Sequence, residues 1–350
     1  MLSNEHLFQK TELGEGNEHH GGAAGGGAVL SGSTGTTGTP GVTLNGAENE
    51  GINELRGGDG DDTLNGTGGF LTLVGGGGTN TFNVQAGEDT LADAKPGTDH
   101  INVSSGATAV LNLTSSTANA NLSTATTNNS GTLLINAAPA TTSTITGSSG
   151  SDDIRGGTGA VNVQESAGND TINGGTGGIN AVAYNNVTSA VLSLNPAGTA
   201  TVQKASLGTD TLNNVQRLHF TDTNIALDIN GHAGMTAKIL GAVFGASSVT
   251  ANPAYVGIGL KYLDGGMSYA NLMQLALNAA GATTSAAEVD LLWHNLFHAA
   301  PTAAQAAPYI AMLNSGSTTA AALGTMAADT SVNTANINLV GLQHTGIHYF

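Results

Sequence analysis

Residues 48–92 read ENEGINELR GGDGDDTLN GTGGFLTLV GGGGTNTFN VQAGEDTLA, which is five nine-residue units in succession. All five are versions of the frame Gly-Gly-x-Gly-x-Asp-x-U-x, in which U is a large apolar residue. The fourth position is glycine in every unit, and an unbroken register over five copies predicts a repeat architecture. The residues at position U are Leu55, Leu64, Leu73, Phe82 and Leu91.

The residue types of the unit predict calcium binding. Glycines adopt backbone angles that a Cβ forbids and let carbonyl groups crowd around an ion. The aspartate adds a charged oxygen, and Ca²⁺ prefers about six to eight oxygen ligands in flexible geometry. The apolar residue points inward and stacks on the same residue of neighbouring coils, so burial needs several repeats together. Because clustered carboxylates repel one another without the ion, we expect calcium-dependent folding of this region.

Consecutive units of such a roll lie on opposite sides, so an ion sits between turns that are two units apart. Asp62 and Asn80 then share one side, which is expected to hold an ion through these side chains and nearby glycine carbonyls. The other side carries Asn53, Leu71 and Asp89; Leu71 interrupts it, while Asp89 is kept as a candidate ligand. The candidate glycine ligands of this array are Gly58, Gly60, Gly76 and Gly78.

The same frame returns from residue 147 as GSSGSDDIR, GGTGAVNVQ, ESAGNDTIN and GGTGGINAV. Asp152 and Asp170 share one side, whereas Val161 and Ile179 hold the aspartate position on the other. We expect calcium on the first side and no ion on the second; the alternative is an acidic glycine-rich loop with no ion at all. The candidate glycine ligands of this second array are Gly150 and Gly168.

Composition limits the classes of partner. The 350 residues include 52 glycines, 8 basic and 25 acidic residues, which gives a net charge of −17 and argues against nucleic acid. Residues 1–230 hold 6 basic and 21 acidic residues, and residues 231–350 hold only 2 and 4. The acidic charge therefore belongs with the repeats, as expected if a cation neutralises it. There is no cysteine, so disulfides do not stabilise the fold.

No apolar run reaches the roughly 18 residues of a membrane span. The N-terminal stretch MLSNEHLFQKTELGEG lacks the basic start and apolar core of a cleavable signal. The chain therefore either stays in the cytoplasm or leaves the cell by a route that reads another signal.

Three regions are expected. Residues 1–47 are rich in glycine and predict a flexible arm; alternatively, residues 28–30 or 42–44 form a strand that adds to a neighbour's sheet. Residues 48–230 predict a calcium-binding β-roll or β-solenoid, with low-complexity coils at 103–146 that lack ion sites. Residues 231–350 have apolar residues three and four apart, which predicts five to seven short helices. The expected fold class is mainly β, a parallel roll followed by a C-terminal α-helical bundle.

Residues 48–182 resemble the RTX, or haemolysin-type calcium-binding, repeats of proteins exported by bacterial type I systems. The runs GTDTLNNVQRLHFTDTNIALDI, AKILGAVFG, YVGIGLKYLDGGMSYANLMQLAL and NINLVGLQHTGIHYF resemble the DUF4214-like helical domain that often follows such repeats. The resemblance implies secretion by the type I machinery through an uncleaved C-terminal signal. It also implies calcium binding outside the cell, where millimolar ion makes weak sites useful.

The sequence offers no catalytic residue. No HExxH zinc-protease motif occurs, and no GxSxG elbow lies in a strand–turn–helix context. His294 and His298 are four residues apart, as are His344 and His348, but no glutamate accompanies either pair, and packing or an interface explains them better than zinc. Secreted RTX enzymes carry a catalytic domain before the repeats, whereas only 47 glycine-rich residues precede them here, so we expect a protein that is not an enzyme.

Two function classes remain. The first is a secreted structural protein of the cell surface or extracellular matrix, in which calcium rigidifies copies that assemble into a surface layer, fibre or filament. The second is a monomeric adhesin or carbohydrate-binding module that recognises cell-surface polysaccharide. Assembly on addition of calcium separates the two, and the structural protein is the preferred hypothesis.

Overall fold

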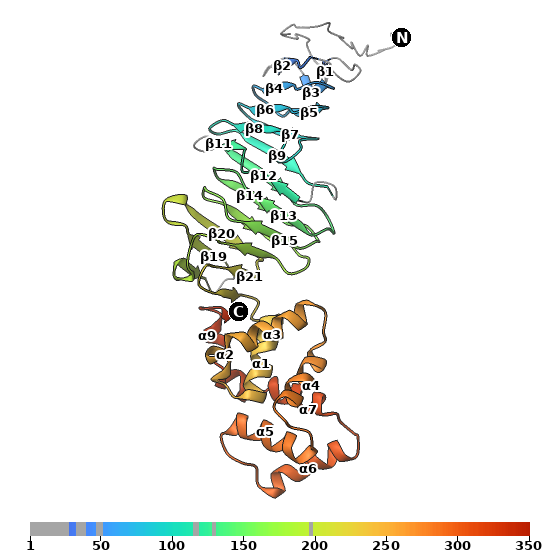
Figure 1. Ribbon diagram of the computed structural model, residues 1–350, viewed down its shortest axis with the longest axis vertical. Coiled ribbons are helices and arrows are strands. Elements are labelled where there is room, and N and C mark those ends of the chain that lie inside the picture. Colours follow the sequence, from blue (N-terminus) through green and yellow to red (C-terminus); the bar gives the residue numbers. More distant parts are fainter. Residues whose placement is uncertain (1–27, 33–39, 47–51, 115–118, 128–130, 196–198) are drawn as a thin grey trace, which may run out of the picture. The chain divides into compact units, whose positions relative to one another are not determined.

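The computed structural model describes residues 28–32, 40–46, 52–114, 119–127, 131–195 and 199–350 (Figure 1). The chain divides into two units, each described here by itself. The strand unit takes in residues 1–183 and 200–214, and the helical unit takes in residues 184–199 and 215–350. Of the arm predicted at residues 1–47, the first 27 residues lie outside the described part.

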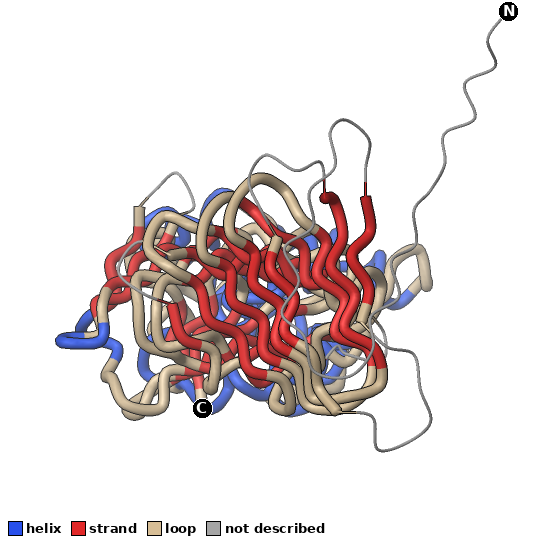
Figure 2. The backbone as a smooth tube through the Cα atoms, turned by 90° about the horizontal axis from the view of Figure 1, so that it is seen from above, coloured by secondary structure: helices blue, strands red, loops and turns tan. Residues whose placement is uncertain are grey.

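The strand unit consists of short strands in three sheets, joined by turns at both ends of the strands (Figure 2). Neighbouring strands are parallel in every described pair except β19–β20. The long sheet contains, in order, β1 (Ala28–Ser31), β3 (Ile52–Gly58), β5 (Thr72–Gly76), β7 (Glu88–Leu91), β9 (Thr108–Asn112), β12 (Thr132–Asn136), β14 (Asp152–Arg155), β16 (Thr171–Asn173), β20 (Thr209–Asn213) and β19 (Ala200–Gln203). The N-terminal short sheet contains β2 (Thr43–Asn45), β4 (Thr63–Gly66), β6 (Thr81–Val84), β8 (His100–Val103) and β11 (Thr126–Thr127). The C-terminal short sheet contains β10 (Asn119–Asn121), β13 (Ser143–Thr146), β15 (Val161–Gln164) and β17 (Ala181–Ala183).

The nonapeptide repeat sets the alternation of strands between sheets. From β1 to β8, successive strands belong alternately to the long sheet and to the N-terminal short sheet. Leu55 therefore pairs with Leu73, and Leu64 pairs with Phe82. The two residues of each pair lie two nine-residue units apart in the chain. Two nine-residue units thus make one full coil, as the repeat predicts.

A column of aliphatic residues forms the core of the long sheet. Each residue pairs in register with the next, and all are buried, because successive coils place the same inward position at the same height. Burying a side chain of this size contributes roughly 1.5–3 kcal/mol, so the column is the main apolar stabilisation of the sheet. Its members are Leu30, Leu55, Leu73, Leu91, Leu111, Ile135, Ile154, Ile172 and Leu212.

An asparagine ladder runs along the N-terminal short sheet, one residue after the inward position. The amide of Asn65 donates to Asn45 at 2.6 Å, that of Asn83 to Asn65 at 2.7 Å, and that of Asn102 to Asn83 at 2.8 Å. Such side-chain ladders form when identical residues stack in register. The sequence analysis had not assigned these asparagines a role.

The low-complexity stretch at 103–146 forms longer coils. The apolar stretches near residues 109–113, 133–135 and 144–146 form β9, β12 and β13. Thr108 pairs with Thr132, which is an offset of 24 residues instead of 18, and β9, β10 and β11 each enter a different sheet. The extra residues therefore add a third strand to this coil.

The N-terminal boundary differs from the one expected at residue 48. Strands β1 and β2 precede that residue and pair with β3 and β4 of the same chain. The parts of the predicted arm that the structure describes are thus the first coil of the strand unit. Strand formation at 28–30 and 42–44 had been the alternative, with a neighbouring chain as the expected partner.

The helical unit begins with η1 and short strands and continues with helices. Strands β21, β22 and β23 form an antiparallel arrangement, so this unit is not composed of helices alone. Within the described residues, no helix is both long and apolar enough to cross a membrane. The elements are η1 (Ser189–Val191), β18 (Leu192–Leu194), β21 (Arg217–His219), β22 (Asn224–Ala226), α1 (His232–Phe244), α2 (Ser248–Ala251), α3 (Pro253–Asp264), α4 (Tyr269–Ala279), α5 (Ser285–Phe297), α6 (Ala303–Asn314), α7 (Ala320–Ala328), α8 (Ser331–Asn336), α9 (Leu339–Leu342) and β23 (Ile347–Tyr349).

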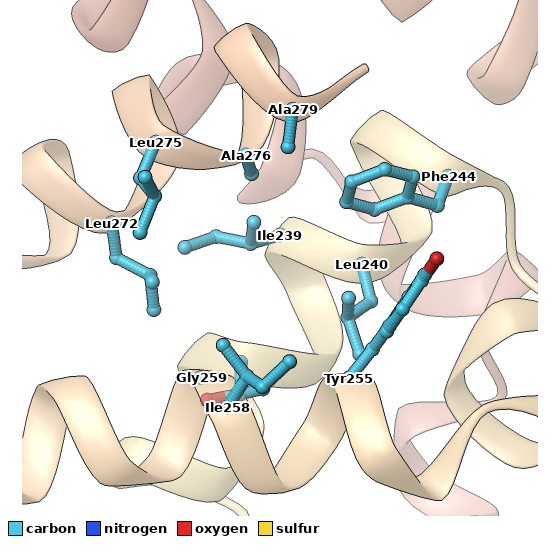
Figure 3. A pocket seen from close by; sticks show the side chains of 11 residues that line it. Ile239, Leu240, Phe244, Tyr255, Ile258, Gly259, Leu272, Leu275, Ala276 and Ala279 are labelled. Carbon is cyan, nitrogen blue, oxygen red and sulfur yellow. The ribbon is translucent and has the colours of Figure 1, made fainter.

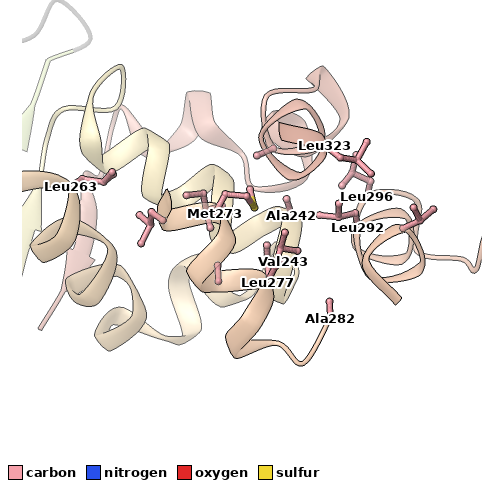
Figure 4. Packing of buried hydrophobic residues seen from close by; sticks show 14 residues of the cluster. Ala242, Val243, Leu263, Met273, Leu277, Ala282, Leu292, Leu296 and Leu323 are labelled. Carbon is pink, nitrogen blue, oxygen red and sulfur yellow. The ribbon is translucent and has the colours of Figure 1, made fainter. Parts of the chain in front are cut away.

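Local signals explain where the helices start and stop. Pro253 opens α3 at its first turn, and the side chains of Ser268, Thr284 and Thr302 cap the next three helices. The apolar faces of α1, α4, α5 and α7 meet in one core, where Val243, Met273 and other residues are buried (Figure 4). The chain is therefore mixed in class, with parallel-stranded sheets in one unit and nine helices among the described residues of the other.

Candidate metal centre: the turns of the strand unit

The aspartate position of the repeat lies two residues before the inward apolar residue. The polar side chains buried at this position include Asp62, Asn80, Asp89, Asp152 and Asp170. Asp62 and Asn80 precede β4 and β6 in the N-terminal short sheet, so the structure brings these two predicted ligands to adjacent coils. The Oδ1 atom of Asn80 accepts a hydrogen bond from the backbone N–H of Asp62 at 2.9 Å. The side chain of Asn80 therefore holds the backbone of the preceding coil in place at Asp62.

This contact is one rung of a ladder. Asp62 Oδ1 accepts from the N–H of Val42 at 2.8 Å, and Asp99 Oδ1 accepts from the N–H of Asn80 at 2.9 Å. A carboxylate that accepts backbone N–H groups is stabilised in its charged form. The aspartate position therefore has a structural role that the sequence analysis did not foresee, and Asp99 shares it.

Asp89 makes the same contact in the long sheet. Its Oδ1 atom accepts from the N–H of Leu71 at 3.0 Å, and the side chain is fully buried. The side chain of Leu71 itself offers no oxygen, as the sequence indicates for this side.

Asp62 and Asp89 each keep a second carboxylate oxygen, Oδ2, that is buried and has no hydrogen-bond partner among the described residues. Burial raises the pKa of both carboxyl groups, that of Asp89 to about 6. A buried charged oxygen without a partner is costly, and a bound cation would lower this cost. These two residues therefore fit the predicted Ca²⁺ site, since each offers an oxygen that nothing in the described protein satisfies.

The glycines predicted as ligands stack closely on one another. A Cβ on Gly76 would collide with the carbonyl oxygen of Gly58, and a Cβ on Gly78 with that of Gly60. Gly58, Gly76 and Gly78 have positive φ, which favours glycine further. Gly168 and Gly150 form the same kind of pair in the second array, so only glycine fits these turns.

Two charged residues that the sequence analysis did not select bind the turn at residues 75–78. Asp93 accepts from the N–H groups of Gly75 and Gly76, at 2.7 Å each. Lys95 Nζ donates to the carbonyl oxygens of Gly76 at 2.6 Å and Gly78 at 3.2 Å. The ammonium group of Lys95 thus contacts the carbonyl oxygens of two glycines, Gly76 and Gly78, that the sequence predicts as calcium ligands.

The second array brings Asp152 and Asp170 together on the long sheet, again as predicted. Asp170 Oδ1 accepts from the N–H of Asp152 at 3.0 Å. Both oxygens of Asp152 accept hydrogen bonds from Ser148, one from its N–H at 2.7 Å and one from its hydroxyl at 2.8 Å. Asp170 Oδ2 accepts from the hydroxyl of Ser166 at 3.1 Å and from Lys204 Nζ at 3.1 Å. All four oxygens therefore have protein donors, unlike those of Asp62 and Asp89.

Burial and, to a smaller extent, the neighbouring charge of Asp170 raise the pKa of Asp152 to about 7. The pKa of Asp170 is also raised by burial, while Lys204 opposes the shift. Calcium at these two carboxylates stays a prediction, and their oxygens fit a metal ion less well than Asp62 Oδ2 does.

The side of the second array expected to lack an ion carries one amide. Strand β15, which begins at Val161, pairs with β17 in a register that aligns Val163 with Val182. The nonapeptide frame therefore shifts by one residue between these two strands. Asn180, and not Ile179, then takes the aspartate position, and its Oδ1 accepts from the N–H of Val161 at 2.9 Å. The sequence frame missed this shift because it kept a fixed spacing of nine.

Within the described residues, no three His, Cys, Asp or Glu side chains gather closely enough to hold a metal ion by themselves. A calcium site in these turns would depend mainly on backbone carbonyl oxygens, with at most two carboxylates per site.

The helical unit contains a separate apolar pocket of about 200 Å³ between α1, α3 and α4 (Figure 3). Ile239 and Leu240 of α1 face Ile258 of α3 and Leu275 of α4 across it. The hydroxyl of Thr236, which also lines the pocket, is buried and has no hydrogen-bond partner within the part of the chain that the structure describes. The lining offers no charged group, so it does not provide a second ion site.

No family model, no curated protein and no solved structure matches this chain.

Proposed function

We propose that this chain is a secreted, calcium-binding structural protein of the bacterial cell surface or extracellular matrix. In this proposal the strand unit is an RTX-type β-roll that calcium rigidifies, and copies of the chain assemble into a layer, fibre or filament. The observation that carries it is the pair of buried oxygens, Asp62 Oδ2 and Asp89 Oδ2, without partners beside turns of closely stacked glycines.

The physical argument for an ion concerns the calcium-free state. Each buried carboxylate loses its hydration, and the raised pKa values of Asp62 and Asp89 express that loss. A divalent cation would replace the lost water with direct charge contacts, and weak oxygen sites are filled at millimolar calcium outside cells. Secretion by a type I system is supported by the sequence resemblance.

Assembly is supported by exposed apolar residues on the helical unit. Tyr255, Ile258 and Tyr262 lie three and four residues apart on α3 and are 45%, 51% and 40% exposed. Leu275 of α4 is 39% exposed and lines the same pocket as Tyr255 and Ile258. Such patches mark contact surfaces, and the proposed occupant is a second copy of this chain.

A calcium titration tests the proposal. Circular dichroism and light scattering are recorded on the purified full chain as calcium is added and then removed by a chelator. We expect β signal to grow together with particles much larger than one chain, and we expect Asp62→Asn with Asp89→Asn to weaken both responses. Asp222→Asn, at an exposed loop of the helical unit, is the matched control.

Two other outcomes decide against parts of the proposal. A gain of β signal without growth in particle size would favour the monomeric adhesin, which should then retain a polysaccharide ligand. No response to calcium would remove the metal assignment at both aspartates.

A further inference from the structure

Lys204 is a buried lysine whose ammonium group contacts oxygens of Ser166, Asp170 and Asp210. Its side chain is 0% exposed, and it follows β19 in the strand unit. Nζ lies 2.7 Å from the carbonyl oxygen of Ser166, 3.1 Å from Asp170 Oδ2 and 2.6 Å from Asp210 Oδ1. Three oxygens match the three N–H donors of an ammonium group.

The two carboxylates occupy the aspartate position of consecutive coils. Asp170 precedes Ile172 and Asp210 precedes Leu212, and those two apolar residues pair in register. Asp210 Oδ1 also accepts from the N–H of Asp170 at 3.2 Å. The same kind of hydrogen bond joins Asp170 Oδ1 to the N–H of Asp152, so the two contacts form a series across three coils. The ammonium group therefore lies where the repeat pattern predicts calcium, between equivalent carboxylates of adjacent coils.

Burial of Lys204 needs an energetic reason. Lysine is almost never fully buried unless it is paired, because desolvating an ammonium group costs several kcal/mol. Here Asp152, Asp170 and Asp210 are buried close together, and repulsion among them would be severe without a positive charge. The lysine and the carboxylates thus compensate one another.

The other basic side chains in the described part of the strand unit show that this placement is selective. Arg56 and Arg155 are 48% and 57% exposed and pair with acidic residues two positions away on their own strands. Lys95, in contrast, reaches back 19 and 17 residues to the carbonyls of Gly76 and Gly78. Both lysines bind turn oxygens, whereas both arginines remain on strand surfaces.

We propose that Lys204 is a built-in cation that takes the place of a metal ion between Asp170 and Asp210. The second array is then held together without metal, and removing the ammonium group turns this turn into a metal site. The identity of that metal as Ca²⁺ rests on the proposed function, but the role of the ammonium group does not.

The test replaces Lys204 by methionine, which keeps the apolar stem and removes the charge. Bound Ca²⁺ per chain is counted by equilibrium dialysis, and thermal unfolding is followed with and without calcium. Lys204→Met is expected to bind one more ion than the wild type, to unfold at a lower temperature without calcium and to recover when calcium is added. Lys238→Met is the matched control, because it removes an ammonium group paired with Asp329 at 3.0 Å on the surface of the helical unit.

Equal ion counts for the wild type and Lys204→Met would overturn the proposal, as would an unfolding temperature that calcium does not restore. If Lys204→Met does not fold without calcium, the triple variant Lys204→Met, Asp170→Asn, Asp210→Asn decides. It is expected to fold without calcium and to gain no ion, and its failure to fold would mean that Lys204 acts through packing alone. If the wild type binds no calcium, the proposed function is wrong. Lys204→Met would still be expected to gain one ion.

Discussion

Asp62 and Asp170 hold the same position of the repeat, but their second carboxylate oxygens have different surroundings. Both use Oδ1 to accept a backbone N–H, from Val42 and Asp152 respectively. The second oxygen of Asp170 receives an ammonium group and a hydroxyl, whereas that of Asp62 has no partner among the described residues. At the scale of single residues, the aspartate thus connects adjacent coils through Oδ1, and its other oxygen, Oδ2, is the candidate ion ligand.

Gly76→Ala should destabilise the strand unit far more than Gly106→Ala. Both glycines have positive φ, +85° and +78°, so alanine costs roughly 1–2 kcal/mol at either position. Only at Gly76 would the new Cβ collide with a stacked carbonyl, that of Gly58, which adds about 1–3 kcal/mol. Denaturant unfolding followed by circular dichroism measures the difference, and equal losses would mean that the coils are not stacked as described.

Calcium-free protein should become less stable as the pH rises from about 4 to 7. The folded-state pKa values of Asp89, about 6, and Asp152, about 7, exceed the ordinary value of 3.8. In this window the folded state binds more protons than the unfolded state, so the free energy of unfolding falls with rising pH. Unfolding temperatures of calcium-stripped protein at a series of pH values test this. Asp89→Asn with Asp152→Asn should flatten the curve, and a temperature that rises with pH would contradict it.

At the scale of elements, each strand is short and depends on the coils on either side of it. Strands of two to seven residues bury little surface alone, but the aliphatic column and the asparagine ladder connect them in register. Stability of such an array is shared between neighbouring repeats, as in other solenoids.

Leu73→Ala should therefore loosen β3 and β7 as well as its own strand β5. The side chain is fully buried between Leu55 and Leu91, so its truncation costs about 2–5 kcal/mol. Hydrogen exchange, resolved by peptide, should show loss of protection in all three strands. Thr72→Ala, half-buried on the other face of β5, should change stability by less than about 0.5 kcal/mol. Loss of protection in β5 alone would argue against shared stability.

At the scale of the whole molecule, most acidic residues belong to the strand unit, and most of the exposed large apolar residues belong to the helical unit. Residues 231–350 hold only 2 basic and 4 acidic residues, and α3 presents Tyr255, Ile258 and Tyr262 to solvent. In the proposed assembly, the strand unit responds to calcium and the helical unit supplies an apolar contact between copies.

Ile258→Asp should reduce assembly without changing calcium binding. A carboxylate in the centre of the exposed apolar row would have to be desolvated in any contact between copies. Light scattering at saturating calcium should show smaller particles, while dialysis gives the same ion count as the wild type. Thr250→Asp, an exposed position on α2, is the control and should assemble normally. Unchanged particle size for Ile258→Asp would place the contact elsewhere.

Much of the strand unit could be predicted from the repeat. The period, the inward residues and the pairing of Asp62 with Asn80 and of Asp152 with Asp170 follow from local spacing. The glycine frame does not reach β1 and β2, which precede residue 48 and pair with β3 and β4. The shift from Ile179 to Asn180 was missed because a coil can absorb one extra residue in a turn.

The sequence by itself determined which residues face inward and which coils are neighbours, because in a parallel repeat both depend on a fixed local period. Only the tertiary structure decided how each aspartate is neutralised. Lys204 lies 34 residues after Asp170 in the chain, and its ammonium group reaches that carboxylate only when the coils are stacked. A charge pair between distant residues leaves no periodic signal, so only the folded chain shows it.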